Sequence, residues 1–193
     1  MRTIDEEKRN KIVQAVFDIV TEEGLAGLTF SKIAKRVKVS TATAYVYFEN
    51  KEDMISKIYI DVKQLFDEGL KESIEQGTTM RERLFHCVFH FVRRFCEHPR
   101  EANFVLALQD NPEYLSEEAT KVAEYYTKPM LVLYEEALSQ RLLKAQNVSE
   151  INAFLFAPIL WLMKEYDLQK KPYSADDFKP LIWVSVDSIL NNR

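Results

Sequence analysis

The sequence predicts an all-α protein with an N-terminal domain in residues 1–51 and a second helical domain in residues 52–193. Apolar residues recur at three- and four-residue spacing through most of the chain, which is the spacing of one helix face. Only four glycines and six prolines interrupt the 193 residues, and no segment alternates apolar and polar side chains as a half-buried strand does. With 47% hydrophobic residues, the chain can bury a sizeable core.

About nine helices are expected, and their ends are set by capping residues and helix breakers. The first begins with a capping-box pattern at Thr3 and ends at Gly24, because glycine readily takes a left-handed turn. Pro129 predicts a kink inside the seventh helix. The expected ranges are about 3–24, 29–37, 40–48, 50–77, 79–98, 100–108, 116–144, 147–168 and a last helix from 174 or 177 to 190.

The composition predicts a soluble, cytoplasmic chain. Its first residues are charged and hold no apolar signal segment, and no stretch is long and apolar enough to span a membrane. Cys87 and Cys96 are nine residues apart in one expected helix. This spacing separates them by about 13 Å along the helix axis, which is beyond disulfide reach. Two reduced thiols are typical of a reducing cytosol.

Positive charge is concentrated in one short stretch of an otherwise acidic chain. The whole chain carries a net charge of −4, whereas residues 29–51 hold five basic residues and one acid, a net charge of +4. A basic tip on an acidic body is suited to DNA phosphates. A run of charge can also be only a solvated surface, so this observation needs a motif beside it.

The same stretch has the pattern of two short helices joined by a tight turn. Thr29 can cap a helix with Ile33, Ala34 and Val37 on its inner side, and Ser40 can cap a second helix with Ala44 and Phe48 facing inward. Small and hydroxyl side chains, Ala42, Thr43, Val46 and Tyr47, are left pointing outward. A helix with such a surface can enter the DNA major groove.

The stretch resembles the helix-turn-helix of TetR-family transcriptional regulators, over about a quarter of the chain in detail. The matching positions are Gly24, Gly27, Thr29, Ile33-Ala34, Val39-Ser40, Thr43, Tyr45, Tyr47, Phe48 and Asn50-Lys51-Glu52. The resemblance implies that Thr41, Ala42, Thr43 and Tyr45 meet base edges and that Ser31, Tyr47 and Lys51 touch phosphates. Packing of Tyr45 and Tyr47 against the first helix is the alternative. Lys38 departs from the pattern, since the family usually has glycine at this turn.

The recognition helix contains no Arg, Lys, Asn or Gln, so it cannot make the bidentate contacts that read guanine or adenine. Methyl groups on Thr41, Ala42, Thr43 and Val46 are suited to thymine. The sequence therefore predicts a palindrome that is rich in A·T pairs.

The last two expected helices are apolar almost all round, which indicates either a central core or a partner. In a chain of this size we expect a partner, and the resemblance implies a homodimer built from these two helices. A two-fold dimer can place its recognition helices in successive major grooves. The predicted interface residues are Phe154, Ile159, Leu162, Ile182, Trp183, Val186 and Ile189.

An aromatic-rich interior between these ends is the predicted effector site. The residues assigned to it are Phe85, His86, Phe89, His90, Phe104, Tyr125, Tyr126, Met130 and Trp161. Aromatic stripes often form only a filled core; a cavity is what the resemblance implies. Glu82, His86 and His90 share one helix face, but no second segment supplies a further ligand, so neither a metal nor a cofactor is expected.

The interpretation that follows is a homodimeric DNA-binding regulator, typically a repressor, that leaves a palindromic operator when a small molecule binds. Catalysis is not expected, because the chain has no phosphate-binding glycine loop and no nucleophile elbow. Two alternatives remain: a nucleoid-associated factor on the same fold, and a protein-binding co-activator. The sequence does not specify the effector, the target genes, or repression as opposed to activation.

Overall fold

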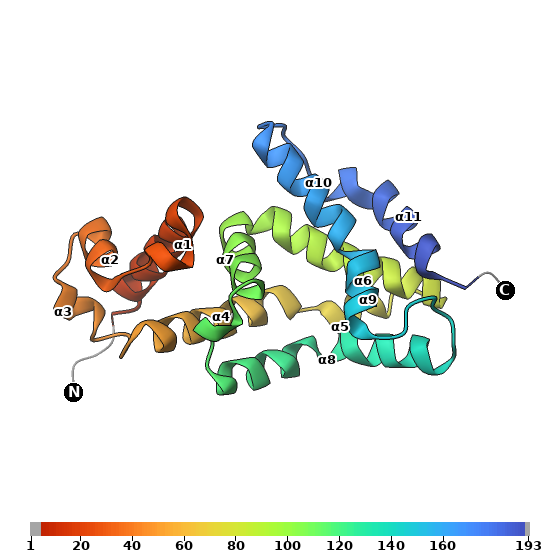
Figure 1. The fold of residues 1–193 in the computed structure, drawn as a ribbon, viewed down its shortest axis with the longest axis horizontal. Helices are drawn as coiled ribbons and strands as arrows, with labels where there is room; N and C mark the ends of the chain where they lie inside the picture. The colour runs from red at the N-terminus through yellow and green to blue at the C-terminus, as the bar shows by residue number, and fades with distance from the viewer. Residues whose placement is uncertain (1–4, 192–193) are drawn as a thin grey trace. The chain divides into compact units, whose positions relative to one another are not determined.

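The computed structural model describes residues 5–191, and within that range the chain is built from helices with no strand (Figure 1). The expected cap at Thr3 lies outside the described residues. An isolated bridge between Leu143 and Leu190 adds one extended contact. The elements are α1 (Glu6–Gly27), α2 (Phe30–Val37), α3 (Thr41–Ala44), α4 (Lys51–Asp67), α5 (Leu70–Ile74), α6 (Met80–Glu97), α7 (Pro99–Gln109), η1 (Pro112–Tyr114), α8 (Glu117–Ser139), α9 (Val148–Leu155), α10 (Ala157–Leu168), η2 (Ala175–Phe178) and α11 (Lys179–Ile189).

The helices pack as two units that do not follow the order of the chain. The first unit holds the described residues up to Leu65 together with His98–Tyr125, and the second holds Phe66–Glu97 together with the described residues from Tyr126 onward. Residues 52–65 and 98–125 therefore share a core with the N-terminal helices. The functional boundary predicted after residue 51 stays a prediction, because packing alone does not say which residues bind a partner.

In the first unit, α1 is the helix against which its neighbours are arranged. It packs against α2 and against α7. Its buried side chains are Ile12, Ala15, Val16, Phe17, Ile19, Val20 and Leu25. The ring of Phe17 meets the ring of Phe104 on α7 edge to face, at 5.4 Å between centroids. On the outside of the same contact, Arg100 reaches Gln14 at 3.2 Å and Asp18 at 3.2 Å.

In the second unit, α6 and α11 meet along a regular seam. Arg81 donates to Asp187 in a bidentate pair at 2.6 and 2.9 Å, and the rings of Phe85 and Trp183 stack at 4.0 Å. One turn further, the Lys179 ammonium lies 4.8 Å from the ring centre of Phe89. Along this seam the residue numbers rise in α6 and fall in α11, so the two helices run antiparallel.

Two expected helices are each divided in the structure, which gives eleven α-helices in the described chain instead of about nine. The helix expected over 50–77 breaks at Gly69, whose φ of +78° is open to glycine and costly to other residues. The helix expected over 147–168 breaks at Phe156, and Pro158 takes a place in the first turn of α10, where its missing N–H costs nothing. In contrast, α8 continues through Pro129 and ends at Ser139, five residues before the expected end.

A positive φ angle occurs near the C-terminal end of each of the first two helices. Gly24 has φ of +72° and ψ of 178°, which interrupts the helical geometry of α1 at the expected place. Lys38 closes α2 with φ of +57° and ψ of +46°, in the left-handed region, and its side chain is exposed. A non-glycine residue in this region costs on the order of 1 kcal/mol.

Replacing Lys38 with glycine is expected to raise the free energy of unfolding by up to about 1 kcal/mol, because glycine removes the Cβ clash of the left-handed turn. The greater freedom of glycine in the unfolded chain limits the gain. Urea denaturation monitored by circular dichroism measures the difference.

The matched control is Lys35→Gly, which makes the same chemical change three residues earlier, inside α2. Lys35 is exposed, so helix propensity decides the result, and this variant is expected to lose about 1 kcal/mol. A loss of similar size in both variants would contradict the strain assigned to Lys38.

Candidate nucleic-acid interface

The helix-turn-helix has the local geometry that its capping residues predict. Thr29 Oγ1 accepts a hydrogen bond from the Lys32 amide at 3.3 Å, and Ser40 Oγ accepts one from the Thr43 amide at 3.2 Å. Ala44 and Phe48 are buried as expected. The regular part of the second helix is shorter than predicted, because α3 spans only Thr41–Ala44 and a turn continues the chain to Phe48.

The residues predicted to meet base edges differ in their exposure. Ala42 and Tyr45 are exposed, and Thr41 and Thr43 are half-buried. Thr43 Oγ1 lies 2.9 Å from Ser40 Oγ, so this hydroxyl already has a partner in the free protein. Val46 is as exposed as Tyr45, at 53% for each. The predicted surface is therefore mainly methyl groups and one phenol.

Tyr45 packs and stays exposed at the same time. Its ring stacks on Phe30 with 4.1 Å between centroids and 5° between planes. The alternative prediction for Tyr45 is packing against the first helix; in the structure its ring packs against Phe30 at the start of α2 instead. Periodicity did not identify Phe30 as its partner, since the two residues lie in different helices.

Two of the three predicted phosphate contacts are engaged within the chain. Tyr47 Oη donates to the Asp5 carbonyl at 3.3 Å. Lys51 Nζ donates to the Leu25 carbonyl at 2.7 Å and lies 4.7 Å from the ring centre of Tyr114. Burial lowers the pKa of the Lys51 ammonium. Ser31, the third, is exposed at the start of α2.

The basic tip is partly neutralised by acids at the end of α1. Arg36 donates to both carboxylate oxygens of Glu22 at 2.9 and 2.5 Å, and Lys32 pairs with Glu23. The hydrogen bonds from Arg36 hold the pKa of the Glu22 carboxyl below its usual range. Residues 29–51 carry a net charge of +4, and counting Glu22 and Glu23 with them lowers the net charge of this surface to +2. Lys35 and Lys38 are exposed, and neither forms an ion pair within residues 5–191.

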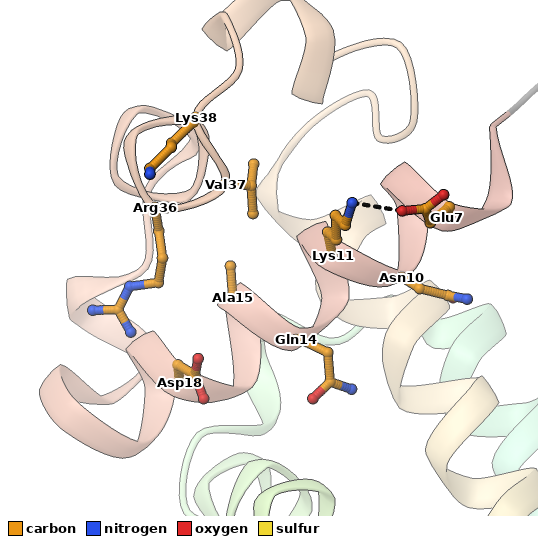
Figure 2. Close-up of a pocket in the computed structure, with 9 residues that line it drawn as sticks. All are labelled: Glu7, Asn10, Lys11, Gln14, Ala15, Asp18, Arg36, Val37 and Lys38. Atoms are coloured by element: carbon orange, nitrogen blue, oxygen red, sulfur yellow. Dashed lines mark hydrogen bonds and ion pairs between the residues drawn. The ribbon is translucent and has the colours of Figure 1, made fainter.

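An open groove of about 550 Å³ lies beside the turn, between α1 and the end of α2 (Figure 2). Ala15 and Val37 contribute apolar atoms, whereas charged and amide side chains make up most of the remaining wall. Figure 2 shows Lys11 turned toward Glu7, with which it pairs at 2.6 Å. The lining residues are Glu7, Asn10, Lys11, Gln14, Ala15, Asp18, Arg36, Val37 and Lys38.

The residues predicted to line one effector pocket divide between the two units. Phe104 belongs to the first unit, where it meets Phe17, and Tyr125 belongs to it as well and is 74% exposed. The other seven belong to the second unit, and among them Trp161 is 64% exposed. The nine residues therefore do not form a single cluster within either unit.

Within the second unit, the predicted pocket residues on α6 are packed against neighbours. Phe85 stacks on Trp183, as described above, and on Phe89 at 5.7 Å, and the ring of His86 meets Phe85 edge to face at 5.5 Å. His90 is buried and donates from Nε2 to the Phe66 carbonyl at 2.8 Å. Burial lowers the pKa of this imidazole. The remaining two are Met130, which is buried, and Tyr126, which is half-buried.

Glu82 serves as a cap of α6. Its carboxylate accepts hydrogen bonds from the Thr78 amide and hydroxyl at 2.8 and 2.7 Å and from the Thr79 amide at 3.1 Å. These bonds lower the pKa of the Glu82 carboxyl to about 2. Among the described residues, no three His, Cys, Asp or Glu side chains are grouped as metal ligands would be.

Four of the seven predicted interface residues lie in the core of a single chain. Ile159, Ile182, Val186 and Ile189 are fully buried, Leu162 and Trp183 are half-buried, and Phe154 is exposed. The predicted interface contains residues from both faces of these apolar helices, whereas in the structure one face of each helix is buried in the core of the single chain. The large apolar side chains of this segment that are exposed are Phe154, Trp161, Leu168 and Val184. In the described part of the chain, no helix is long and apolar enough to cross a membrane.

Comparison with known proteins finds a family match over the N-terminal helices. Residues 12–58, which hold most of α1, all of α2 and α3 and the start of α4, match the family of bacterial regulatory proteins named tetR. The chain is 34% identical over 77 residues to a fatty acid metabolism regulator protein of Bacillus subtilis, and 33% identical over 86 residues to the HTH-type transcriptional regulator HbdR of Aromatoleum. These matches cover 40% and 45% of this chain and about two fifths of the relatives, 40% and 38%.

Solved structures share the fold over the full chain. A TetR family transcription regulator from Marinobacter aquaeolei aligns with a TM-score of 0.81 at 23% identity, covering 100% of both chains. The regulator FadR from Bacillus subtilis, solved in complex with stearoyl-CoA, aligns with a TM-score of 0.65 at 20% identity, covering 92% of this chain and 97% of FadR. The N-terminal match and the shared fold agree with each other. Residues 12–58 are similar to the tetR family of bacterial regulatory proteins, and the chain as a whole has the fold of solved TetR family regulators.

Proposed function

We propose that this protein binds a palindromic DNA operator as a homodimer and is released from it by a small molecule. The observation that carries the proposal is the exposed surface formed by Ala42, Tyr45 and Val46, presented by a helix-turn-helix of the tetR family. Such a surface fits the major groove because its side chains at the leading end are small.

Base reading by this surface depends on methyl groups and hydroxyls. Contacts from Thr41, Ala42 and Val46 favour the methyl group of thymine, and no side chain from residue 40 to 48 can make a bidentate contact to guanine. We therefore assign an operator with A·T pairs under the recognition helices.

The phosphate contacts fall on two kinds of residue. Ser31, Lys35 and Lys38 are exposed and can meet phosphates without giving up an ion pair within residues 5–191. Tyr47 and Lys51 bind carbonyl oxygens in the free protein, so each exchanges one acceptor for a phosphate oxygen on binding. The exchange costs little, because a charged phosphate is a stronger acceptor than a neutral carbonyl.

The proposed homodimer uses the outer face of α9, α10 and α11. Trp161 and Leu168 are seven residues apart on α10 and share one face, and Phe154 and Val184 are exposed on α9 and α11. Large exposed apolar side chains on neighbouring helices are typical of an interface, and tryptophan is enriched among its strongest contacts. Two-fold symmetry then places two recognition helices about 34–36 Å apart.

Release by an effector is a shift of population. A small molecule that binds more tightly to dimers whose recognition helices are out of register with successive grooves lowers the DNA-bound fraction. We assign a long-chain acyl-CoA as the first ligand class to test. The support comes from two relatives, a fatty acid metabolism regulator in sequence and a stearoyl-CoA complex in fold.

Selection of bound duplexes from a random library is expected to enrich a palindrome with A·T-rich half-sites about one helical turn apart. Lys38→Gln should keep the motif and reduce the slope of log affinity against log salt by about 1, because one phosphate contact is lost. Lys121→Gln, an exposed lysine on α8, is the control and should leave the slope unchanged.

Binding without an enriched motif would contradict the operator and favour a nucleoid-associated role. A complete lack of binding would instead favour a module that binds another protein. An operator with invariant G·C pairs under the recognition helices would overturn the thymine assignment alone.

Trp161→Glu is expected to convert the dimer to a monomer, because it places two charges in the proposed interface. Sedimentation velocity measures the mass, and circular dichroism checks that the helices remain. Val132→Glu, which adds the same charge at an exposed apolar position on α8, is the control and should stay dimeric. An unchanged mass for Trp161→Glu would contradict the proposed face.

Stearoyl-CoA is expected to raise the thermal midpoint of the protein and to displace the selected operator in fluorescence anisotropy. CoA alone and stearate alone, at the same concentration, separate recognition of the whole ligand from effects of either part. A shift by stearate equal to that by stearoyl-CoA would point to a fatty acid effector. No shift with any of the three would reject this ligand class.

A further inference from the structure

The stacked pair of Phe30 and Tyr45 joins the two helices of the proposed DNA-binding surface. Phe30 is the first residue of α2, directly before the exposed Ser31, and Tyr45 directly follows α3. The rings are parallel within 5° at 4.1 Å between centroids. Phe30 is almost fully buried, whereas its partner keeps half of its surface open to solvent. The buried ring is therefore a fixed base for an exposed one.

The phenol of Tyr45 differs from the other hydroxyls that could face DNA. The hydroxyls of Thr43 and Tyr47 already interact with Ser40 and with the Asp5 carbonyl. In residues 5–191, the Tyr45 hydroxyl has no hydrogen-bond partner. It also extends further from the backbone than the hydroxyl of Thr41 can. The stack on Phe30 therefore holds the ring, and no hydrogen bond within the described residues holds the hydroxyl.

We propose that Phe30 is a positioning residue for base recognition: it holds the Tyr45 ring so that the phenol is presented to one defined base position. This inference rests on the proposed function and adds a residue that would not itself touch DNA. A free tyrosine side chain would have to be ordered on binding, and ordering a side chain weakens association by roughly 2- to 10-fold. The stack orders the ring before DNA arrives.

The stack also lies between two residues with different proposed roles: Ser31 as a phosphate contact and Tyr45 as a base contact. Ser31 follows Phe30 in the first turn of α2, so the stack joins the start of this helix to the residue that directly follows α3. Separating the two rings would expose the apolar area that they bury against each other, which opposes movement of one helix end away from the other. The pair therefore favours one spacing between Ser31, a proposed phosphate contact, and Tyr45, a proposed base contact.

A double-mutant cycle tests the inference with the operator that the wild-type protein selects. Phe30→Leu removes the ring and keeps an apolar side chain, and Tyr45→Phe removes the hydroxyl and keeps the stack. Each single variant should bind the operator about 3- to 10-fold more weakly. In the Phe30→Leu background, Tyr45→Phe should have almost no further effect, because the hydroxyl is no longer positioned.

Base preference provides a readout that a merely structural role would not change. Selection with Phe30→Leu and with Tyr45→Phe should relax the same operator position in each half-site and leave the others intact. Phe17→Leu is the matched control, since Phe17 is buried in an aromatic pair of the same unit but packs against Phe104. This control should lower stability and keep the motif.

Additive losses in the cycle, or a motif that Phe30→Leu leaves unchanged, would overturn the positioning role while DNA binding stands. An undiminished affinity of Tyr45→Phe would overturn it as well, since the hydroxyl would then make no contact. Failure of the wild-type protein to select any duplex would reject the proposed function itself and this inference with it.

Discussion

The buried face of α1 is the constraint on which the proposed recognition surface depends. Ile12, Val16 and Ile19 are almost completely buried, and the same helix packs against α2 and α7. A helix as short as α3 is not stable alone, because ordering the backbone of the first turn costs more free energy than its hydrogen bonds contribute. Its orientation is therefore set by tertiary packing, with Ala44 and Phe48 as its buried contacts. Truncation of a fully buried isoleucine typically costs 2–5 kcal/mol, so α1 stabilises the motif far more than any surface contact does.

The exposed side of α1 has a different effect, which is electrostatic. The pairs Glu22–Arg36 and Glu23–Lys32 are solvent-exposed, and such pairs contribute about 0–1 kcal/mol each. Their main consequence is to reduce the positive charge available to DNA. A phosphate that takes Arg36 away from Glu22 leaves a carboxylate unpaired beside a polyanion. The favourable charge contacts are therefore expected from Lys35 and Lys38, which form no such pair in the described chain.

Local features could be predicted from the sequence because their causes lie within one turn. Thr29 and Ser40 cap helices through amides three residues ahead, and Gly24 breaks α1 by its own backbone freedom. Gly69 lies inside the helix expected over 50–77, because a single glycine within an apolar pattern does not reveal its φ angle. The contact from Lys51 to the Leu25 carbonyl was not predicted, because it joins residues 26 positions apart. For α10 and α11, periodicity indicated apolar helices but not which face is inside; burial of Ile159 and Ile182 decides this.

A recognition surface without long polar side chains has to obtain its specificity from geometry. A methyl group that contacts thymine contributes only the free energy of burying its own apolar surface, about 25 cal/mol per Å². One such contact therefore discriminates weakly between bases. A hydroxyl can donate or accept, and it therefore distinguishes bases only when its direction is fixed. In the free protein, Thr43 and Tyr47 have their hydroxyls fixed by hydrogen bonds, and Tyr45 has its ring fixed by Phe30. Under the proposed function, selectivity at this surface depends on how many side chains are ordered before DNA binds. The stack adds the ring of Tyr45, whose hydroxyl has no hydrogen-bond partner in the described chain, to these ordered side chains.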